Sequence, residues 1–443
     1  MNGSVIMQTH FFVYSAVYLP LINIKIVLLH GIKTFGKNKL EKILKILLKL
    51  ELCYIIYVHR ILGVIFLKKK SVSKKSVILM EFDWFLFILT ILLSIFGVVM
   101  IYSATRTTHS NINVIVQSGA LIIGCALMIV TCFFDYEQLK NLVKPIYIFA
   151  VAILILVLII GVGNNEWGAK SWIRFGAIGI QPSEIAKVCF IITFSYHLSK
   201  VHDDINKPLV ILGLLLHIGA LLALIALQPD VGSALVFVFM FICLMFVAKI
   251  SYKYIIPISV VGIVSLPLIY KYVLAEHQRW RIQVFLNPDL APLKEGYNVI
   301  QSKIAVGSGQ LWGKGYLQGT QNQMDYLPAK STDFIFGVIS EELGFIGAMI
   351  IVVMLFLLIY KCFKIAQKAD NAFGRYICVG VGSMMLFHVF ENVGMCIGLM
   401  PVTGIPLPFI TYGGTSLVVN MIAIGLVLSV AYHNKPRSVF DVY

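Results

Sequence analysis

Residues 278–333 read QRWRIQVFLNPDLAPLKEGYNVIQSKIAVGSGQLWGKGYLQGTQNQMDYLPAKSTD and stand between two long apolar stretches. They combine several cations and carboxylates with glycines and amides. A chain this apolar needs only short turns to join its helices, and long loops without regular structure inside a compact protein are usually functional. We therefore expect a membrane protein that acts on a charged group at one membrane face, rather than one that only forms a pore.

The composition indicates a chain that crosses a membrane several times. Hydrophobic residues make up 59% of the sequence, and the mean hydropathy is +0.89. Both values lie far above those of a soluble domain. The formal net charge of +15 does not indicate nucleic-acid binding, because the lysines and arginines gather in short connectors between apolar stretches, as cytoplasmic loops do.

The cysteines give no sign of a structural disulfide or a thiolate metal site. All eight lie in or beside apolar stretches, none falls in residues 278–333, and no CxxC pair occurs. Cysteines in such surroundings are usually buried and inert.

The apolar pattern predicts an all-α polytopic membrane protein with about ten transmembrane helices. A large extracytoplasmic loop, residues 271–333, stands between the seventh and the eighth helix. The lysine-rich connectors all fall on one side, which must be the cytoplasm, so both termini are expected there. The expected spans are 84–103, 112–134, 145–163, 182–199, 209–227, 231–248, 254–270, 334–360, 373–399 and 415–432.

Residues 1–79 fit this pattern less well than residues 80–443, which form the expected transmembrane domain. They are basic and semi-apolar, and no small-residue cleavage site of a secretory signal follows them. They form one or two extra helices or interfacial segments, or the protein begins near Met80. We expect a dispensable extension.

One outward connector places charged residues at the start of the fourth span. It reads GAKSWIRFGAIGIQPSEIAK, residues 168–187. Pro182 suits a first helical turn, and Glu184 and Lys187 then share one helix face. Such a pair is costly in lipid and is expected to face a hydrated cavity, although it can also be a structural ion pair. Lys170 and Arg174 add cations to the same rim or act as interfacial anchors.

The other outward connectors carry further candidates. Asp230 can cap the sixth span or have a functional role. Arg279 and Arg281 have the forked geometry that suits pyrophosphate oxygens, but they can also reach toward the membrane interface. Residues 401–416, PVTGIPLPFITYGGTS, are too rich in proline for a continuous helix and predict a folded outer hairpin packed between helices.

Acidic residues also occur at or inside the last spans. Asp333 precedes the eighth span, and Glu341 and Glu342 are expected about two turns into it. Glu391 and Asn392 fall inside the ninth.

Six blocks of this sequence closely resemble the SEDS family (shape, elongation, division and sporulation) of bacterial membrane proteins. They occur in the family's order and cover about residues 81–433, and the run from QSKIA to GTQ with the TDFIF that follows it is more similar to the RodA branch than to the FtsW branch. The blocks are GAKSWIRFGAIGIQPSEIAK, QPDVGSAL, QRWRIQVFLNP, GYNVIQSKIAVGSGQLWGKG, TDFIFGVISEELG and PVTGIPLPFITYGGTS.

The resemblance implies a peptidoglycan glycosyltransferase of the bacterial cytoplasmic membrane. Such an enzyme polymerises lipid II in cell-wall elongation, beside a class B penicillin-binding protein that crosslinks the product. A carboxylate takes the proton of the attacking hydroxyl, and cations or a divalent metal (Mg²⁺ or Mn²⁺) neutralise the departing pyrophosphate. The expected substrate-binding residues are Lys170, Arg174, Glu184, Lys187, Asp230, Arg279 and Asp333.

The chain departs from the family pattern at two positions. Ala291 occupies the place of the family's catalytic aspartate, and alanine cannot act as a base. Either Asp289 or Glu295 substitutes, in that order of preference, or the protein is a scaffold for its transpeptidase. Lipid II translocation is a third alternative. Ser331 stands where the RodA branch commonly has histidine.

Overall fold

The computed structural model describes residues 82–108, 111–162, 171–175, 178–273, 276–287, 290 and 295–434. The N-terminal extension of residues 1–79 lies outside this set, so its separation from the transmembrane domain stays a prediction. Lys170, Asp289 and Ala291 also lie outside the described residues.

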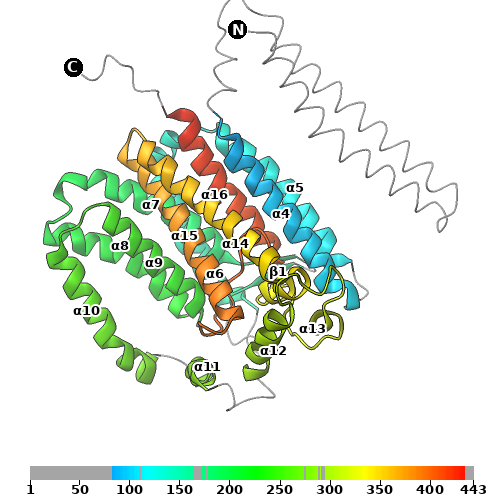
Figure 1. Cartoon of the computed structure of the whole chain (residues 1–443). Helices are drawn as coiled ribbons and strands as arrows, with labels where there is room; N and C mark the ends of the chain where they lie inside the picture. Colours follow the sequence, from blue (N-terminus) through cyan, green and yellow to red (C-terminus); the bar gives the residue numbers. More distant parts are fainter. Residues whose placement is uncertain are drawn as a thin grey trace, which may run out of the picture. The chain divides into compact units, whose positions relative to one another are not determined.

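Each of the ten expected spans contains a helix (Figure 1), so the all-α polytopic fold is confirmed. Seven of the helices in the described residues are long and apolar enough to cross a membrane. α7 carries charged residues, and α9 and α10 have 17 residues each, so the number ten stays a prediction. The ten helices are α4 (Trp84–Thr105), α5 (Ile112–Phe133), α6 (Leu139–Ile160), α7 (Pro182–Lys200), α8 (Pro208–Ala226), α9 (Val231–Val247), α10 (Tyr252–Leu268), α14 (Ile335–Lys368), α15 (Ala372–Cys396) and α16 (Gly414–His433).

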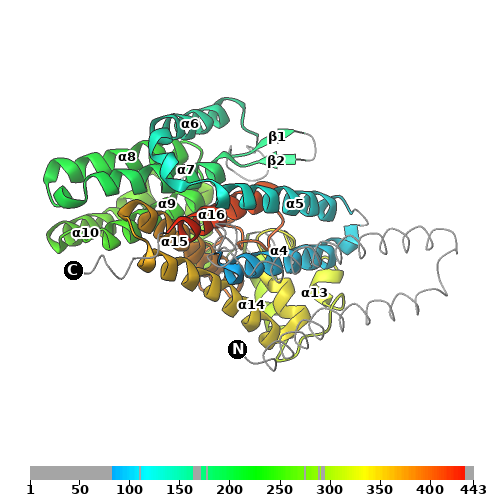
Figure 2. The same ribbon diagram turned by 90° about the horizontal axis from the view of Figure 1, so that it is seen from above.

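α15 is the central helix of the bundle. It packs against α7, α9, α14 and α16, and most of its side chains are buried. A Cβ atom on Gly380 would lie 2.9 Å from Ile191 of α7, so a small residue is what lets these two backbones approach. α10 lies at the periphery, beside α8 and α9 (Figures 1 and 2). The large apolar side chains left exposed on the outer helices face the space that lipid fills.

A short β-hairpin in the connector before α7 departs from the all-α expectation. β1 (Ile173–Phe175) pairs antiparallel with β2 (Ile178–Ile180), beside the helix bundle in Figure 2. Thr415 at the start of α16 donates from Oγ1 to the Gly179 carbonyl oxygen at 2.8 Å. β-branched residues on both strands favour the extended backbone, and this contact holds the hairpin on the bundle.

The expectation that residues 271–333 lack regular structure is wrong. This connector contains α11 (Glu276–Leu286), α12 (Glu295–Ser308) and the single turn α13 (Thr320–Gln323). α12 buries Val299, Ser302 and Ala305, a spacing of three that marks one helix face. Ser302 Oγ donates to the Cys396 carbonyl oxygen at 2.8 Å, so α12 is held against the C-terminal end of α15.

α14 is broken near its N-terminal end. At Gly344 the backbone has φ 68° and ψ −172°, which only glycine adopts readily. The break frees backbone groups of α14 that pair with residues 310–315, and irregular backbone at membrane depth is tolerated only where protein satisfies it. The four hydrogen bonds are Lys314 N to Glu341 O (3.0 Å), Gly315 N to Glu342 O (3.0 Å), Phe345 N to Gln310 O (2.8 Å) and Ile346 N to Leu311 O (3.2 Å).

The proline-rich connector before α16 is a folded segment packed between helices, as the sequence predicts. Ile405, Leu407 and Phe409 are buried. Gln117 of α5 donates to the Thr411 carbonyl oxygen at 3.2 Å. The segment is thus held against α5 and lies next to the end of α15 and the residues before α14.

Candidate active site

Three segments meet around Asp333 at the end of the bundle where α14 begins and α15 ends. Asn392 of α15 donates from Nδ2 to the carbonyl oxygen of Asp333, which precedes α14, at 2.9 Å. The same amide nitrogen donates to the Ile405 carbonyl oxygen at 2.8 Å. A single buried amide therefore fixes Asp333 relative to α15 and the proline-rich connector.

Two carboxylates face neighbouring residues of that connector. Thr403 donates from Oγ1 to Glu391 Oε1. A Cβ atom on Gly404 would lie 3.7 Å from Asp333 Oδ2. Because Thr403 and Gly404 are adjacent in the chain, both carboxylates are brought to one place. We call Asp333, Glu391, Thr403 and Arg281 the Asp333 cluster.

The cluster's two carboxylates differ in exposure. Asp333 is half-buried, whereas the Glu391 side chain is 2% exposed and its Oε2 has no hydrogen-bond partner in the described part of the chain. Burial raises the pKa of Asp333 to about 6, and the positive charge of Arg281 on α11 acts in the opposite direction.

α11 carries Arg281, whose positive charge acts on Asp333. Gln278 donates from Nε2 to the Pro229 carbonyl oxygen at 3.0 Å, which fixes α11 beside the turn before α9. Arg279 is half-buried, and its Nε has no hydrogen-bond partner within the described residues. Of the two predicted arginines, Arg281 acts on Asp333 by its charge, and the contact of Arg279 and Arg281 with pyrophosphate stays a prediction.

Glu184 and Lys187 lie deeper than the sequence analysis expected. Lys187 Nζ is 2.8 Å from Glu184 Oε1 and 2.9 Å from His388 Nε2, and the pair is only 1–2% exposed. His388 Nδ1 lies 3.2 Å from the Pro406 carbonyl oxygen. That oxygen can only accept, so Nδ1 carries the hydrogen and Nε2 accepts from Lys187. The pair joins α7 to α15 behind the Asp333 cluster, and its predicted contact with substrate is untested.

Asp230 has the capping role that was one of its two interpretations. Its Oδ1 accepts from the Ser233 backbone amide at 3.0 Å, and its Oδ2 accepts from Ser233 Oγ at 2.8 Å. Ser183 Oγ adds a longer contact of 3.4 Å from the start of α7. Asp230 therefore caps α9 and ties it to α7.

The remaining predicted residues are dispersed or undescribed. Arg174 lies exposed on β1, away from these contacts, and Glu295 opens α12. Asp289 and Lys170 lie outside the described residues. Sequence analysis missed His388 and did not include Glu391 among the site residues. Both are ionisable residues inside an apolar stretch, which is the signal that marks functional positions in membrane helices.

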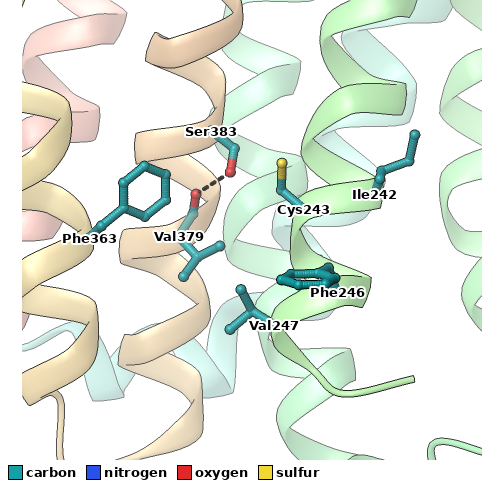
Figure 3. A pocket seen from close by; sticks show the side chains of 7 residues that line it. All are labelled: Ile242, Cys243, Phe246, Val247, Phe363, Val379 and Ser383. Carbon is teal, nitrogen blue, oxygen red and sulfur yellow. Dashed lines mark hydrogen bonds between the residues drawn. The ribbon is translucent and has the colours of Figure 1, made fainter. Parts of the chain in front are cut away.

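The apolar cavity in Figure 3 is a different kind of site. It has a volume of about 280 Å³ and lies between α9, α14 and α15, toward the ends opposite the Asp333 cluster. Its one hydroxyl, Ser383 Oγ, donates to the Val379 carbonyl oxygen at 2.7 Å. The cavity suits hydrocarbon rather than a sugar phosphate. Its lining residues are Ile242, Cys243, Phe246, Val247, Phe363, Val379 and Ser383.

A family model described as "Cell cycle protein" (FtsW/RodA/SpoVE) matches residues 83–436. The chain belongs to this family. It is 36% identical over 368 residues to a probable peptidoglycan glycosyltransferase FtsW of Geobacter metallireducens, with 80% of this chain and 96% of that protein covered. It is 34% identical over 325 residues to the peptidoglycan glycosyltransferase MrdB of Escherichia coli, with 72% and 86% covered.

Solved structures show the same fold. One chain, from a peptidoglycan synthase complex that coordinates polymerization and crosslinking, superposes with a TM-score of 0.68 at 27% identity, with 80% of this chain and 99% of that chain covered. The rod shape determining protein RodA of Thermus thermophilus superposes with a TM-score of 0.61 at 28% identity, covering 80% and 98%. The expected family is confirmed. Relatives carry both FtsW and RodA-type names, so the RodA branch stays a prediction.

Proposed function

We propose that this protein is a peptidoglycan glycosyltransferase that polymerises lipid II at the outer face of the bacterial cytoplasmic membrane. The relatives named above carry this activity in their names. The observation that carries the proposal is the Asp333 cluster, which sets carboxylates and a cation together at the outward ends of α11, α14 and α15. A reaction between two sugars of membrane-anchored substrates needs a base and a counter-charge at that depth.

The transfer has a simple balance. The 4-hydroxyl oxygen of the acceptor GlcNAc forms a bond to the anomeric carbon of the donor MurNAc. The bond from that carbon to undecaprenyl pyrophosphate breaks, and the pyrophosphate leaves with the electron pair. The hydroxyl proton passes to a carboxylate, and Arg279 and Arg281 compensate the charge of the leaving group.

A divalent cation has no assigned step in this mechanism. In the ranges that the structure describes, no group of three or more His, Cys, Asp or Glu side chains could hold a metal ion. A cation held by one carboxylate and the substrate's own phosphates would not need such a group. The steps above therefore use only side chains of the chain itself.

The partner is proposed to be a class B penicillin-binding protein. The structural relative from a synthase complex, in which polymerization and crosslinking are coordinated, supports this. Elongation rather than division is the proposed role, on the RodA-like blocks of residues 301–321 and 332–336. Complementation of strains lacking the elongation or the division enzyme separates the two roles.

The orientation is tested by labelling. A single cysteine at Gln318 is expected to react with an impermeant thiol reagent in intact spheroplasts, because α12 and α13 lie at the outward ends of the spans. The unmodified chain is the control, since none of its cysteines falls in this connector. Labelling only after lysis would reverse the proposed topology.

Polymerisation of purified lipid II by the purified protein, with and without its transpeptidase, tests the activity. We expect glycan strands, and we expect Arg281→Ala to reduce their rate far more than Arg174→Ala. A chain that makes no polymer but stimulates crosslinking by its partner is a scaffold. Movement of lipid II across vesicle membranes without polymer formation would identify a translocator.

A further inference from the structure

We propose that Asp333 is the general base of this transfer, in place of the aspartate that Ala291 replaces. The inference rests on the proposed function and identifies the atom that receives the acceptor's proton. It replaces Asp289 as the expected base. Three features of the structure carry it: the position of Asp333, the incomplete pairing of the carboxylate beside it, and a cation that acts on it without an ion pair among the described residues.

The backbone of Asp333 is held in place by contacts to its carbonyl oxygen, whereas its carboxylate has no hydrogen-bond partner among the described residues. Its carbonyl oxygen receives the Asn392 amide, and the Cys396 thiol lies 3.7 Å from the same oxygen. Among the described residues its carboxylate accepts no hydrogen bond from a side chain or a backbone amide, and it is half-buried. A carboxylate held in place, within reach of solvent and not committed to a partner has the geometry that a general base needs.

The hydrogen bonds of Glu391 show that the side chains of the Asp333 cluster do not fully pair with one another. Three carboxylates of the outward half have one buried oxygen without a partner: Glu184, Glu342 and Glu391. Glu184 is compensated by Lys187 at 2.8 Å, and Glu342 accepts from Ser103 at 2.6 Å and from Asn322 at 2.8 Å. Glu391 has the Thr403 hydroxyl alone.

No cation lies within ion-pair distance of Glu391 in the part of the chain that the structure describes. A buried polar atom without a partner is costly. The free oxygen of Glu391 therefore shows that the side chains around Asp333 leave hydrogen-bonding capacity unused among the described residues.

Arg281 supplies a positive charge to the Asp333 cluster without forming an ion pair with Asp333 among the described residues. It is near enough to act on the pKa of Asp333, yet within the described ranges the two side chains form no ion pair at 4.0 Å or less. A substrate that carries both a hydroxyl and a pyrophosphate can then contact Asp333 through the first and Arg281 through the second.

The proton step follows from this arrangement. The O–H bond of the acceptor 4-hydroxyl breaks as its oxygen attacks the anomeric carbon, and the proton moves to an oxygen of Asp333. The leaving pyrophosphate takes the electron pair of the broken glycosidic bond. Asp333 then releases the proton to water.

The pH dependence has a definite sign. A base works in its ionised form, so activity is present above the pKa of Asp333, about 6, and is lost as the pH falls through it. The charged groups facing Asp333 are Arg281 from α11 and Glu391 from α15. Lys303 from α12 lies against Gly398 at the end of α15. The connector 401–413 has no charged residue.

The test uses the full chain with its transpeptidase and labelled lipid II. Asp333→Asn is expected to lower the polymerisation rate about 100-fold or more while lipid II binding and membrane abundance stay unchanged. Asp325→Asn is the matched control, because this aspartate is 61% exposed and pairs with Lys330 outside the cluster. Asp289→Asn is expected to retain activity.

Two further results separate a base from a structural residue. Adding Ala291→Asp to the Asp333→Asn chain is expected to restore polymerisation, with the acid limb of kcat/KM moved to lower pH. A merely structural aspartate would not be replaced by an acid in a different segment.

An active wild-type chain whose Asp333→Asn variant is equally active would overturn the inference and leave the proposed function intact. So would a variant that loses activity only through weaker lipid II binding, or a chain silenced by Asp289→Asn alone. A wild-type chain without polymerase activity would overturn both.

Discussion

Two clusters of acidic residues, one in the first turns of α14 and one around Asp333 just before it, differ in how fully they are paired. Glu341 accepts from Lys314 at 2.8 Å, from Thr320 Oγ1 at 3.2 Å and from the backbone amides of Gln321 and Asn322 at 2.9 and 3.2 Å. We call these residues the Glu341 cluster. Eight positions earlier, the Asp333 cluster offers its carboxylates a single hydroxyl donor and no ion pair among the described residues.

This difference distinguishes carboxylates that stabilise the fold from carboxylates that are available for chemistry. Glu341 caps α13 and holds residues 314–322 against α14, so every contact it makes is internal. A fully satisfied buried network rigidifies a fold. A partly satisfied one is stable only where another partner arrives or the surrounding fold compensates. The two clusters can therefore be tested against each other.

The largest effect is expected when the Glu341 cluster is broken. Glu341→Ala leaves Lys314 and two backbone amides without their acceptor, and each buried donor left without a partner costs about 1–3 kcal/mol. We expect strong loss of folded protein from membranes, measured by abundance and thermal unfolding in detergent. Glu391→Gln is the paired variant, and we expect it to keep its abundance. Equal abundance of the two variants would contradict the difference in pairing between the Glu341 cluster and the Asp333 cluster.

A comparably large effect is expected at the Glu184–Lys187 pair. Lys187→Met leaves Glu184 buried without its cation and removes the donor to His388. We expect abundance to fall, and the double change Glu184→Gln with Lys187→Met to recover much of it, because no buried charge remains. Retained abundance with lost complementation in the single variant would instead place this pair in substrate binding.

A smaller effect is expected from filling the junction between the connector and α14. A Cβ atom on Gly309 would lie 1.9 Å from the Ser340 carbonyl oxygen, whereas one on Gly307 would meet nothing within 4 Å. Gly309→Ala is therefore expected to destabilise the protein by about 1–3 kcal/mol, and Gly307→Ala to have little effect. Matching melting temperatures for the two variants would contradict the packing described at this junction.

The spans could be predicted from the sequence because a bilayer demands long apolar stretches, and those are visible in any one segment. The helices within the connector 271–333 were harder to predict. α12 buries Ser302 in the middle of its inner face, so its helical pattern is not apolar. The break in α14 was invisible because Gly344 stands in a run that reads as one helix, and only the backbone of residues 310–315 explains it.

The candidate site shows the same limit. Asp333, Arg279 and Arg281 stood out as charged residues beside apolar stretches. The contact of Glu391 with Thr403 could not be foreseen, because the connector's fold brings Thr403 back onto α15. His388 and Lys187 come from helices far apart in the chain, and their meeting depends on how α7 packs against α15.

The break at Gly344 also has a consequence for how the protein is made. Residues 310–315 leave the ribosome before the α14 backbone groups that receive them. In the proposed orientation, the connector crosses the membrane first, and its amides and carbonyls stay in water until α14 has been inserted. Its final position is reached only when two segments delivered at different times meet. The junction between residues 310–315 and α14 is thus the last part of this region to assemble, and an error in inserting α14 would leave this junction unformed.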